Sequence, residues 1–132
     1  MASKIEEKKV KNLSKISYQL NNFNELVEES SFIINQEKLD IIKLGKLLGE
    51  SWKIKKKLTN DISTKDLDKI YHTAITNGAY GGKLLGAGGG GFFYFLCDKY
   101  KKNIIKKKLK YKCIDIKIEN SGSKIIFDNN IK

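Results

Sequence analysis

Several residue types on which whole functional classes depend are scarce in this chain of 132 residues. It contains no proline and no arginine, only one histidine (His72), and two cysteines, Cys97 and Cys113. Two cysteines are too few for a disulfide-stapled scaffold. A lone histidine without cysteine or acidic companions is neither a metal site nor part of a catalytic triad. The composition therefore excludes a disulfide-rich secreted domain, and it predicts no metal site.

Long hydrophobic runs are also missing. No apolar stretch approaches the roughly 20 residues that span a bilayer, and the N-terminal MASKIEEKKVK lacks the apolar segment of a secretory signal. With a mass of 15.0 kDa, 40% hydrophobic and 31% charged residues, the chain has the size and composition of one folded domain over residues 1–132. We therefore expect a cytoplasmic, single-domain α+β protein without membrane association.

The charge is strongly positive, with a formal net charge of +11. Such an excess is typical of proteins that bind polyanions. All 26 basic residues are lysine, however, whereas sequence-specific readers of nucleic acid depend on the bidentate fork of arginine. The abundance of Lys, Ile and Asn also matches the codon bias of an AT-rich genome. The charge by itself therefore does not identify nucleic acid as the partner.

Apolar periodicity predicts three helices in the first half of the chain. Steps of three and four residues predict one long helix over residues 5–35, either as a bundle helix or as a short coiled coil. A second helix is predicted over 38–58, with Trp52 on its apolar face and lysines in its last turn. The third begins at Ser63, whose hydroxyl is placed to cap it, and ends at 77–78, an Asn-Gly pair.

The second half changes to strand patterns. Residues 92–97, FFYFLC, form a continuous apolar run that predicts a buried strand, and 98–109 predict a helix. Alternating residues predict a half-exposed strand over 112–119, and a turn leads from it into another strand over 124–128. The expected order is three helices, a glycine loop, strand, helix, strand, strand. This order predicts an α+β fold in which a helical layer packs on a small, mostly antiparallel sheet.

Glycine is concentrated in one place, with eight of the eleven glycines in the segment 78–91, NGAYGGKLLGAGGGGF in context. Each glycine costs about 0.5–1 kcal/mol relative to alanine in regular structure. A turn needs one or two glycines, whereas 88–91 are four in succession. We interpret the segment as a loop whose backbone is approached closely by an anionic ligand. A flexible hinge or tight packing is the alternative interpretation.

Three phosphate-binding motifs can be compared with this loop. Gly86 to Gly91 satisfy the dinucleotide-binding spacing, but that motif needs a strand before it and a helix after it. A P-loop would need Ser or Thr after Lys83, where the chain has leucine. Gly78 and Gly81 have the G-x-x-G spacing of RNA-binding KH domains, in which helices flank the loop. A small lysine-rich RNA-binding module is therefore the alternative function.

The segment KLLGAGGGG, residues 83–91, closely resembles the third conserved motif of the GHMP kinases when it follows a helix and enters an apolar strand. The longer GAYGGKLLGAGGGGFFYFL is most similar to the sugar-kinase branch that contains D-glycero-D-manno-heptose 7-phosphate kinase and fucokinase. LGESWKIKKKL, residues 48–58, resembles the helix before the motif, and GSKIIF, residues 122–127, resembles the closing strand. The resemblance is strong over 47–127 and looser over 1–46.

The resemblance implies a two-domain, ATP-dependent kinase that uses Mg²⁺ and phosphorylates a sugar hydroxyl, such as that of a heptose 7-phosphate. In this family the N-terminal domain carries a proline-containing loop that holds the ATP phosphates, together with an acidic catalytic residue. The chain has no proline, so that loop is not in it. We therefore expect residues 1–132 to be the C-terminal, ferredoxin-like domain alone, inactive without an N-terminal kinase domain in the same chain or in a separate subunit.

The resemblance also implies site residues, none of them catalytic or metal-binding. The loop near the transferred phosphate corresponds to Gly86, Ala87, Gly88, Gly89 and Gly90. Residues that could line the substrate are Lys83, Glu50 and Trp52, with Lys55 as a further candidate. Structural roles are the competing interpretation: Trp52 in the core and Lys83 as a packing residue. The element after the loop separates the two functions, because the kinase places a strand there and a KH domain a helix.

Overall fold

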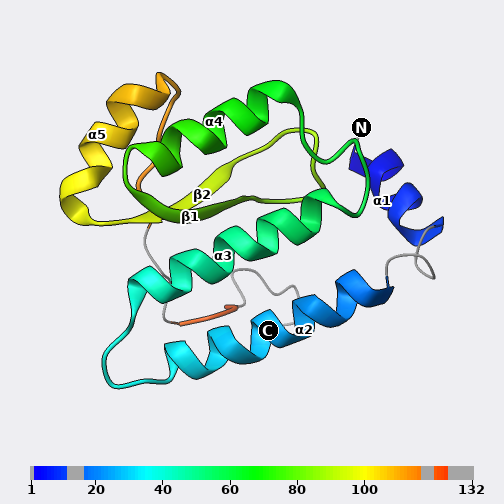
Figure 1. Ribbon diagram of the computed structural model, residues 1–132, viewed down its shortest axis with the longest axis horizontal. Coiled ribbons are helices and arrows are strands. Elements are labelled where there is room, and N and C mark those ends of the chain that lie inside the picture. Colours follow the sequence, from blue (N-terminus) through cyan, green and yellow to red (C-terminus); the bar gives the residue numbers. More distant parts are fainter. Residues whose placement is uncertain (1, 12–16, 117–120, 125–132) are drawn as a thin grey trace, which may run out of the picture.

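Five helices and two strands make up the parts of the chain that the computed structural model describes, residues 2–11, 17–116 and 121–124 (Figure 1). The elements are α1 (Ala2–Lys11), α2 (Ser17–Ile34), α3 (Ile41–Lys56), α4 (Lys65–Thr76), β1 (Ala79–Leu84), β2 (Phe93–Cys97) and α5 (Lys99–Leu109). The two strands pair antiparallel. α3 and α4 both contact β1, while α2 packs on α3 and α5 packs on α4. The predicted α+β class, with helices packed on an antiparallel sheet, is confirmed.

The helix α3 confirms the prediction for residues 38–58 with slightly shorter bounds. The side chain of Asp40 caps its first turn by accepting a hydrogen bond from the Lys43 N–H at 2.9 Å. Lysines occupy its last turn, where the helix dipole favours positive charge. Gly45 lies so close to β1 that an added Cβ would be 2.5 Å from the Tyr80 Cβ. Glycine at this position of the helix therefore permits close packing on β1.

The capping residue of α4 differs from the prediction. Thr64, not Ser63, is the N-cap, and its hydroxyl accepts a hydrogen bond from the Leu67 N–H at 3.2 Å. Ser63 instead donates its hydroxyl to Asp68 at 2.9 Å. Adjacent Ser and Thr residues can both act as caps, and the backbone path of the residues before the helix determines which one does. The predicted end is confirmed, with Asn77 as the C-cap.

The single helix predicted over 5–35 is replaced by two helices, α1 and α2, on either side of residues 12–16, which lie outside the described residues. The predicted apolar stripe is also only partly buried. Val27 and Ile34 of that stripe are 65% and 59% exposed, whereas Ile33, which lies outside the stripe, is buried. Periodicity alone does not fix which face of a helix finds a partner, and α2 covers α3 rather than the sheet.

A strand that glycine content concealed is the main addition to the predicted order. Residues 79–84 form β1, in which Leu84 pairs with Phe93 and Gly82 with Phe95. Because glycine has low strand propensity, the sequence alone predicts a loop for this segment. Packing explains the discrepancy: a Cβ on Gly81 would lie 1.7 Å from the Gly45 carbonyl oxygen. Only a glycine strand can approach α3 so closely.

The C-terminal strand predicted over 112–119 is not formed in its described part, residues 112–116. Ile114 and Ile116 are 59% and 66% exposed, so among the described residues no layer covers the apolar face that the alternation implied. A strand needs a neighbouring edge as well as an alternating pattern. Residues 117–119 and most of the strand predicted over 124–128 lie outside the described residues.

Two apolar clusters form the core. The first contains Ile5, Trp52, Ile62 and Leu84, and the second contains Ala74, Ala79 and Ile105. In the first cluster α1, α3, β1 and the connection between α3 and α4 meet at one end of the sheet. The loop between β1 and β2 leaves the sheet at this same end, directly after Leu84.

Candidate functional site

The glycine loop connects β1 to β2 over residues 85–92. Its two ends are closed by a hydrogen bond from the Leu85 N–H to the Phe92 carbonyl oxygen at 2.9 Å. Gly86, Gly88, Gly89 and Gly91 all have positive φ, between 74° and 120°. Side chains with a Cβ rarely adopt this conformation. Four of the glycines are therefore required by the shape of the loop itself.

Gly88 and Gly89 anchor the loop on the connection between α3 and α4. The Gly89 N–H donates to the Ile62 carbonyl oxygen at 3.0 Å. A Cβ on Gly88 would lie 2.9 Å from the Ile62 Cα, and Ile62 itself is fully buried. Since this contact is backbone against backbone, it fixes the middle of the loop. These two predicted site residues therefore have a packing role.

Gly86 and Gly90, unlike Gly88 and Gly89, do not pack against another part of the domain. Both are exposed, and no heavy atom lies within 4 Å of a Cβ added to either residue. Gly86 still needs its positive φ, but Gly90 is outside the positive-φ set. Neither packing within the domain nor backbone conformation therefore requires glycine at position 90. The half-buried Ala87 lies between the exposed Gly86 and the anchored Gly88.

Lys55 from α3 reaches the start of the loop. Its ammonium group donates to the Leu84 carbonyl oxygen at 2.9 Å and also to the Gly86 carbonyl oxygen. Only 7% of the residue is exposed, so this is a buried cation held against the backbone of the loop. The resemblance implies only that Lys55 lines the substrate. Its position one turn beyond Trp52 on the apolar side of the helix was the available signal for burial.

Two other predicted site residues lie away from the loop surface. Trp52 is fully buried, with its ring 5.6 Å from that of Phe93 in an edge-on contact, so the core interpretation is the one that the structure supports. Glu50 is exposed on α3 and forms an ion pair with Lys53 at 2.6 Å. The hydrogen bond that Lys53 donates to the Glu50 carboxylate raises the pKa of Lys53 above its usual value. The structure thus assigns Trp52 to packing and gives Glu50 a surface partner.

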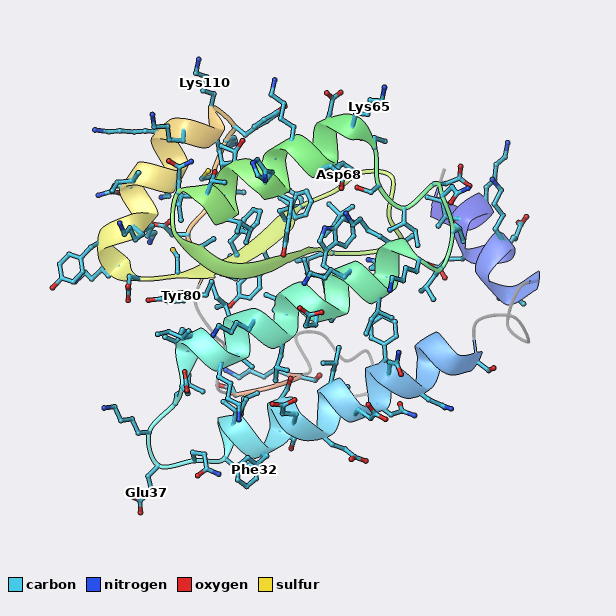
Figure 2. All side chains as sticks on the ribbon, viewed as in Figure 1. Phe32, Glu37, Lys65, Asp68, Tyr80 and Lys110 are labelled. Carbon is cyan, nitrogen blue, oxygen red and sulfur yellow. The ribbon has the colours of Figure 1, made fainter. Side chains whose placement is uncertain are left out.

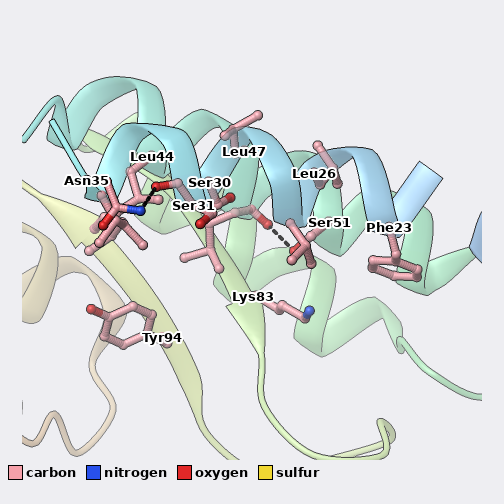
Figure 3. A pocket seen from close by; sticks show the side chains of 14 residues that line it. Phe23, Leu26, Ser30, Ser31, Asn35, Leu44, Leu47, Ser51, Lys83 and Tyr94 are labelled. Atoms are coloured by element: carbon pink, nitrogen blue, oxygen red, sulfur yellow. Dashed lines mark hydrogen bonds between the residues drawn. The ribbon is translucent and has the colours of Figure 1, made fainter. Parts of the chain in front are cut away.

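Lys83 lies on the face of the sheet that is turned toward α2. Figure 3 shows its side chain pointing toward Phe23, with the ammonium group 5.4 Å from the ring centre. It lines an apolar pocket of about 650 Å³ between α2, α3 and the sheet, together with Tyr94 and Ser51. Burial lowers the pKa of Lys83. A second pocket of about 420 Å³ places Lys83 beside Lys55 and Gly86. The structure therefore brings Lys83 next to the first residues of the loop.

In residues 2–11, 17–116 and 121–124, no group of three or more His, Cys, Asp or Glu side chains is arranged to hold a metal ion. Among the same residues, no helix combines the length and apolar character needed to cross a membrane.

The element after the glycine loop is a strand, as predicted from FFYFLC. The G-x-x-G of a KH domain is flanked by helices, whereas here Gly81 lies within β1 and a further strand follows the loop. The RNA-binding alternative rested on that loop topology. The observed order gives it no support.

Known proteins with similar sequences and structures include several kinases. The chain is 50% identical over 64 residues to the D-glycero-alpha-D-manno-heptose 7-phosphate kinase of Campylobacter jejuni, which covers 48% of this chain and 19% of that protein. It is 36% identical over 69 residues to the mevalonate kinase of Thermococcus gammatolerans, covering 52% of this chain and 20% of the relative. The crystal structure of L. major mevalonate kinase in complex with R-mevalonate superposes with a TM-score of 0.75 at 26% identity, over 86% of this chain and 35% of that one.

These matches agree with the motif over residues 83–91. The chain spans only about a fifth to a third of the length of the relatives it matches. The family described as GHMP kinases C terminal matches residues 33–115, more than half of the 132 residues, and the chain belongs to this family.

Proposed function

We propose that this chain is the C-terminal domain of an ATP-dependent sugar kinase whose acceptor is a hydroxyl of a heptose 7-phosphate or a similar sugar. The observation that carries the proposal is the 50% identity over 64 residues to a heptose 7-phosphate kinase, against 36% over 69 residues to a mevalonate kinase. The higher identity favours a sugar over mevalonate as the acceptor. The domain boundary, residues 1–132, is part of the same proposal.

In this proposal the loop of Gly86 to Gly90 faces the phosphate that is transferred. Phosphoryl transfer depends mainly on positioning and on stabilising charge, and backbone N–H groups can do both if no side chain stands in the way. The open space over Gly86 and Gly90 supports such an approach. Gly90 is the sharper argument, because neither packing nor backbone conformation requires glycine there. An external group that comes close to the backbone would require it.

ATP and Mg²⁺ are the cofactors of the proposed complete kinase, in which they supply the phosphoryl group and neutralise its charge. The exposed glycines fit a phosphate, since backbone without side chains is what such a group needs. We assign no Mg²⁺ ligand to the described residues. The metal ligands and the loop that holds the ATP phosphates are proposed to lie in the N-terminal domain.

The proposed partner is therefore an N-terminal kinase domain, in the same polypeptide or as a separate subunit. Two large apolar side chains at the ends of the loop support docking at this place: Leu85 and Phe92 are 49% and 68% exposed. Apolar side chains clustered beside a functional loop favour contact with another protein surface. We expect the isolated 132-residue chain to be folded but inactive, and Lys83 to be near the sugar through the pocket beside the loop.

The test isolates the native protein from its cells with an antibody raised against this chain. The isolated protein is then assayed for phosphoryl transfer from ATP to D-glycero-D-manno-heptose 7-phosphate, with mevalonate as the matched alternative acceptor. We expect the isolated native protein to phosphorylate the heptose phosphate but not mevalonate. We expect no turnover from the recombinant 132-residue chain by itself. Turnover with mevalonate only would refute the sugar assignment. Turnover by the recombinant chain would refute the proposal that activity needs an N-terminal domain.

The role of the loop is tested in the complete kinase by Gly90→Ala. Because a Cβ at Gly90 meets nothing within 4 Å, we expect unchanged thermal stability. Misplacing the reacting groups by about 1 Å costs on the order of 10²-fold in rate, so we expect a loss of kcat of that order. Asn103→Ala, at an exposed position of α5, is the control and should leave kcat unchanged. Equal rates for both variants would mean that nothing approaches Gly90 during catalysis.

A further inference from the structure

We propose that Lys55 is the positioning residue of the glycine loop: its buried ammonium group sets the orientation of the peptide groups through which the loop would meet the phosphate. This inference deepens the proposed kinase function and rests on it for the identity of the ligand. The contact between Lys55 and the loop is a separate structural claim and can be tested without any substrate.

The geometry of Lys55 is unusual for a lysine on a helix. The residue is 7% exposed, and its ammonium group bonds the carbonyl oxygens of Leu84 and Gly86, which lie 29 and 31 residues away in sequence. Hydrogen bonds from a charged donor are about twice as strong as neutral ones. Because the two acceptors belong to the last strand residue and the second loop residue, one side chain holds the chain on both sides of Leu85.

These contacts fix two peptide planes. The peptide bond is planar and trans, so a carbonyl and the N–H of the next residue point in opposite directions. Holding the Leu84 carbonyl toward Lys55 turns the Leu85 N–H away from it, where it donates to the Phe92 carbonyl oxygen at 2.9 Å. By the same geometry, holding the Gly86 carbonyl sets the direction of the Ala87 N–H. Lys55 therefore determines how the loop begins.

The ammonium group is itself placed by rigid packing. α3 approaches β1 so closely that a Cβ on Gly81 would be 1.7 Å from the Gly45 carbonyl oxygen, which leaves the helix little freedom to slide. Trp52, one turn before Lys55, is fully buried in the core cluster with Leu84 and Ile62. The Gly89 N–H bond to Ile62 holds the far side of the loop. The loop is thus held by hydrogen bonds to α3 at its start and to the connection between α3 and α4 at its middle.

The first measurement uses the 132-residue chain labelled with ¹⁵N-glycine, so that its eleven glycines report on the loop and on the rest of the fold separately. Lys55→Met keeps the apolar stem and removes the donors. We expect the Gly86, Gly88 and Gly89 resonances to shift or broaden, with Gly122 unchanged. In a second sample labelled uniformly with ¹⁵N, hydrogen exchange of the Leu85 and Gly89 amides should accelerate by on the order of tenfold, the effect of losing a charged hydrogen bond.

Lys53→Met is the matched control, because it removes the same charge from an exposed position two residues earlier on the same helix. Loop resonances that respond equally to both substitutions, or to neither, would overturn the proposal. If Lys55→Met does not fold, the proposal is tested by a measurement on the unsubstituted chain. The ammonium protons of Lys55 should exchange with water at least roughly tenfold more slowly than those of Lys53. Equal exchange rates would overturn the proposal in that case.

The link to catalysis is measured in the complete kinase. A positioning role predicts that Lys55→Met lowers kcat by on the order of tenfold while the sugar KM stays within about twofold, and that Lys55→Arg, which restores the donors, recovers part of kcat. A change in KM alone would refute positioning. If the protein proves not to be a kinase, the magnetic resonance result still decides whether Lys55 holds the loop, so the two proposals fail independently.

Discussion

Replacing Gly81 with alanine tests the contact that holds α3 on β1. The added Cβ would lie 1.7 Å from the carbonyl oxygen of Gly45 and 2.6 Å from its carbonyl carbon. Both atoms are backbone, so no side chain can rotate away. The φ of Gly81 is not positive, which means that the substitution introduces no backbone strain. The whole penalty therefore comes from overlap between a strand and a helix.

The size of this penalty follows from what must move. To restore van der Waals contact, α3 would have to retreat from β1 by roughly 1.5 Å or more. Overpacking of a core costs about 1–3 kcal/mol when side chains can adjust, and more when they cannot. We expect Gly81→Ala to lower the free energy of unfolding by at least about 3 kcal/mol, out of a total of about 5–15 kcal/mol. For 132 residues this corresponds to a fall in Tm of roughly 10 °C.

Thermal and urea unfolding followed by circular dichroism measure the effect, with Gly90→Ala as the control. Gly90 has open space around it and no positive φ, so alanine there should change the free energy of unfolding by less than about 1 kcal/mol. Tm values for the two variants within about 2 °C of each other would show that the Gly45–Gly81 contact does not limit how α3 sits on the sheet.

Four further substitutions test the core, a helix cap and an ion pair. Trp52→Ala removes a fully buried ring, and urea unfolding should show a loss of about 3–5 kcal/mol. Thr64→Ala should cost about 1 kcal/mol by the same measurement, and Ser63→Ala less than about 0.5 kcal/mol, because only Thr64 caps α4. Asp68, in the first turn of α4 (Figure 2), accepts a hydrogen bond from Lys56 that lowers its pKa below the ordinary 3.8. A lowered carboxyl pKa stabilises the fold above pH 3.8, and this contribution is lost as the pH falls through the folded-state pKa, so Asp68→Asn should flatten the acid limb of a Tm-against-pH curve. Because the pair is exposed, the difference should be no more than about 1 kcal/mol.

The elements that the sequence predicts correctly are those whose signal is local. α3 and α4 carry an apolar face with capping residues and a clear end, and both were found with small errors in their bounds. β2 follows from an uninterrupted apolar run, and α5 from the pattern after Asp98. The pattern does not show which side chains of α5 are buried: Ile105 is buried, whereas Ile104 is 44% exposed. Neighbouring apolar residues point in different directions on a helix, and only one of them faces α4.

The elements that could not be predicted depend on a distant neighbour. β1 has two glycines in the middle, and local propensity assigns such a segment to a loop. Its strand conformation becomes favourable only because α3 carries Gly45 at the point of contact. The C-terminal alternation shows the converse error. Ile114 and Ile116 have the right spacing for a strand, but in the described residues no neighbouring strand pairs with them.

The candidate site shows the same division. The glycine count indicated a loop somewhere in 78–91, because no other segment departs so far from average composition, and the resemblance to the GHMP kinase motif narrowed it to 86–90. What each glycine does was not predictable. Gly88 is required by Ile62, Gly86 by its positive φ, and Gly90 by neither. These distinctions depend on residues more than twenty positions away. The direction of the Lys55 side chain is equally non-local, since its acceptors are 29 and 31 residues further along.

A glycine-rich loop that must hold a fixed shape has to obtain its order from outside itself. Each ordered glycine costs more conformational entropy than any other residue, and it contributes no side-chain contacts in return. In this chain the contacts come from neighbouring elements: Lys55 holds the first carbonyls, Phe92 accepts from Leu85, and Ile62 accepts from Gly89. Because the ends and the middle are fixed in this way, Gly90 can remain exposed without contacts while the loop stays ordered. In the proposed kinase such a loop would be ordered before it meets the phosphate, so that little binding energy would be lost in arranging it.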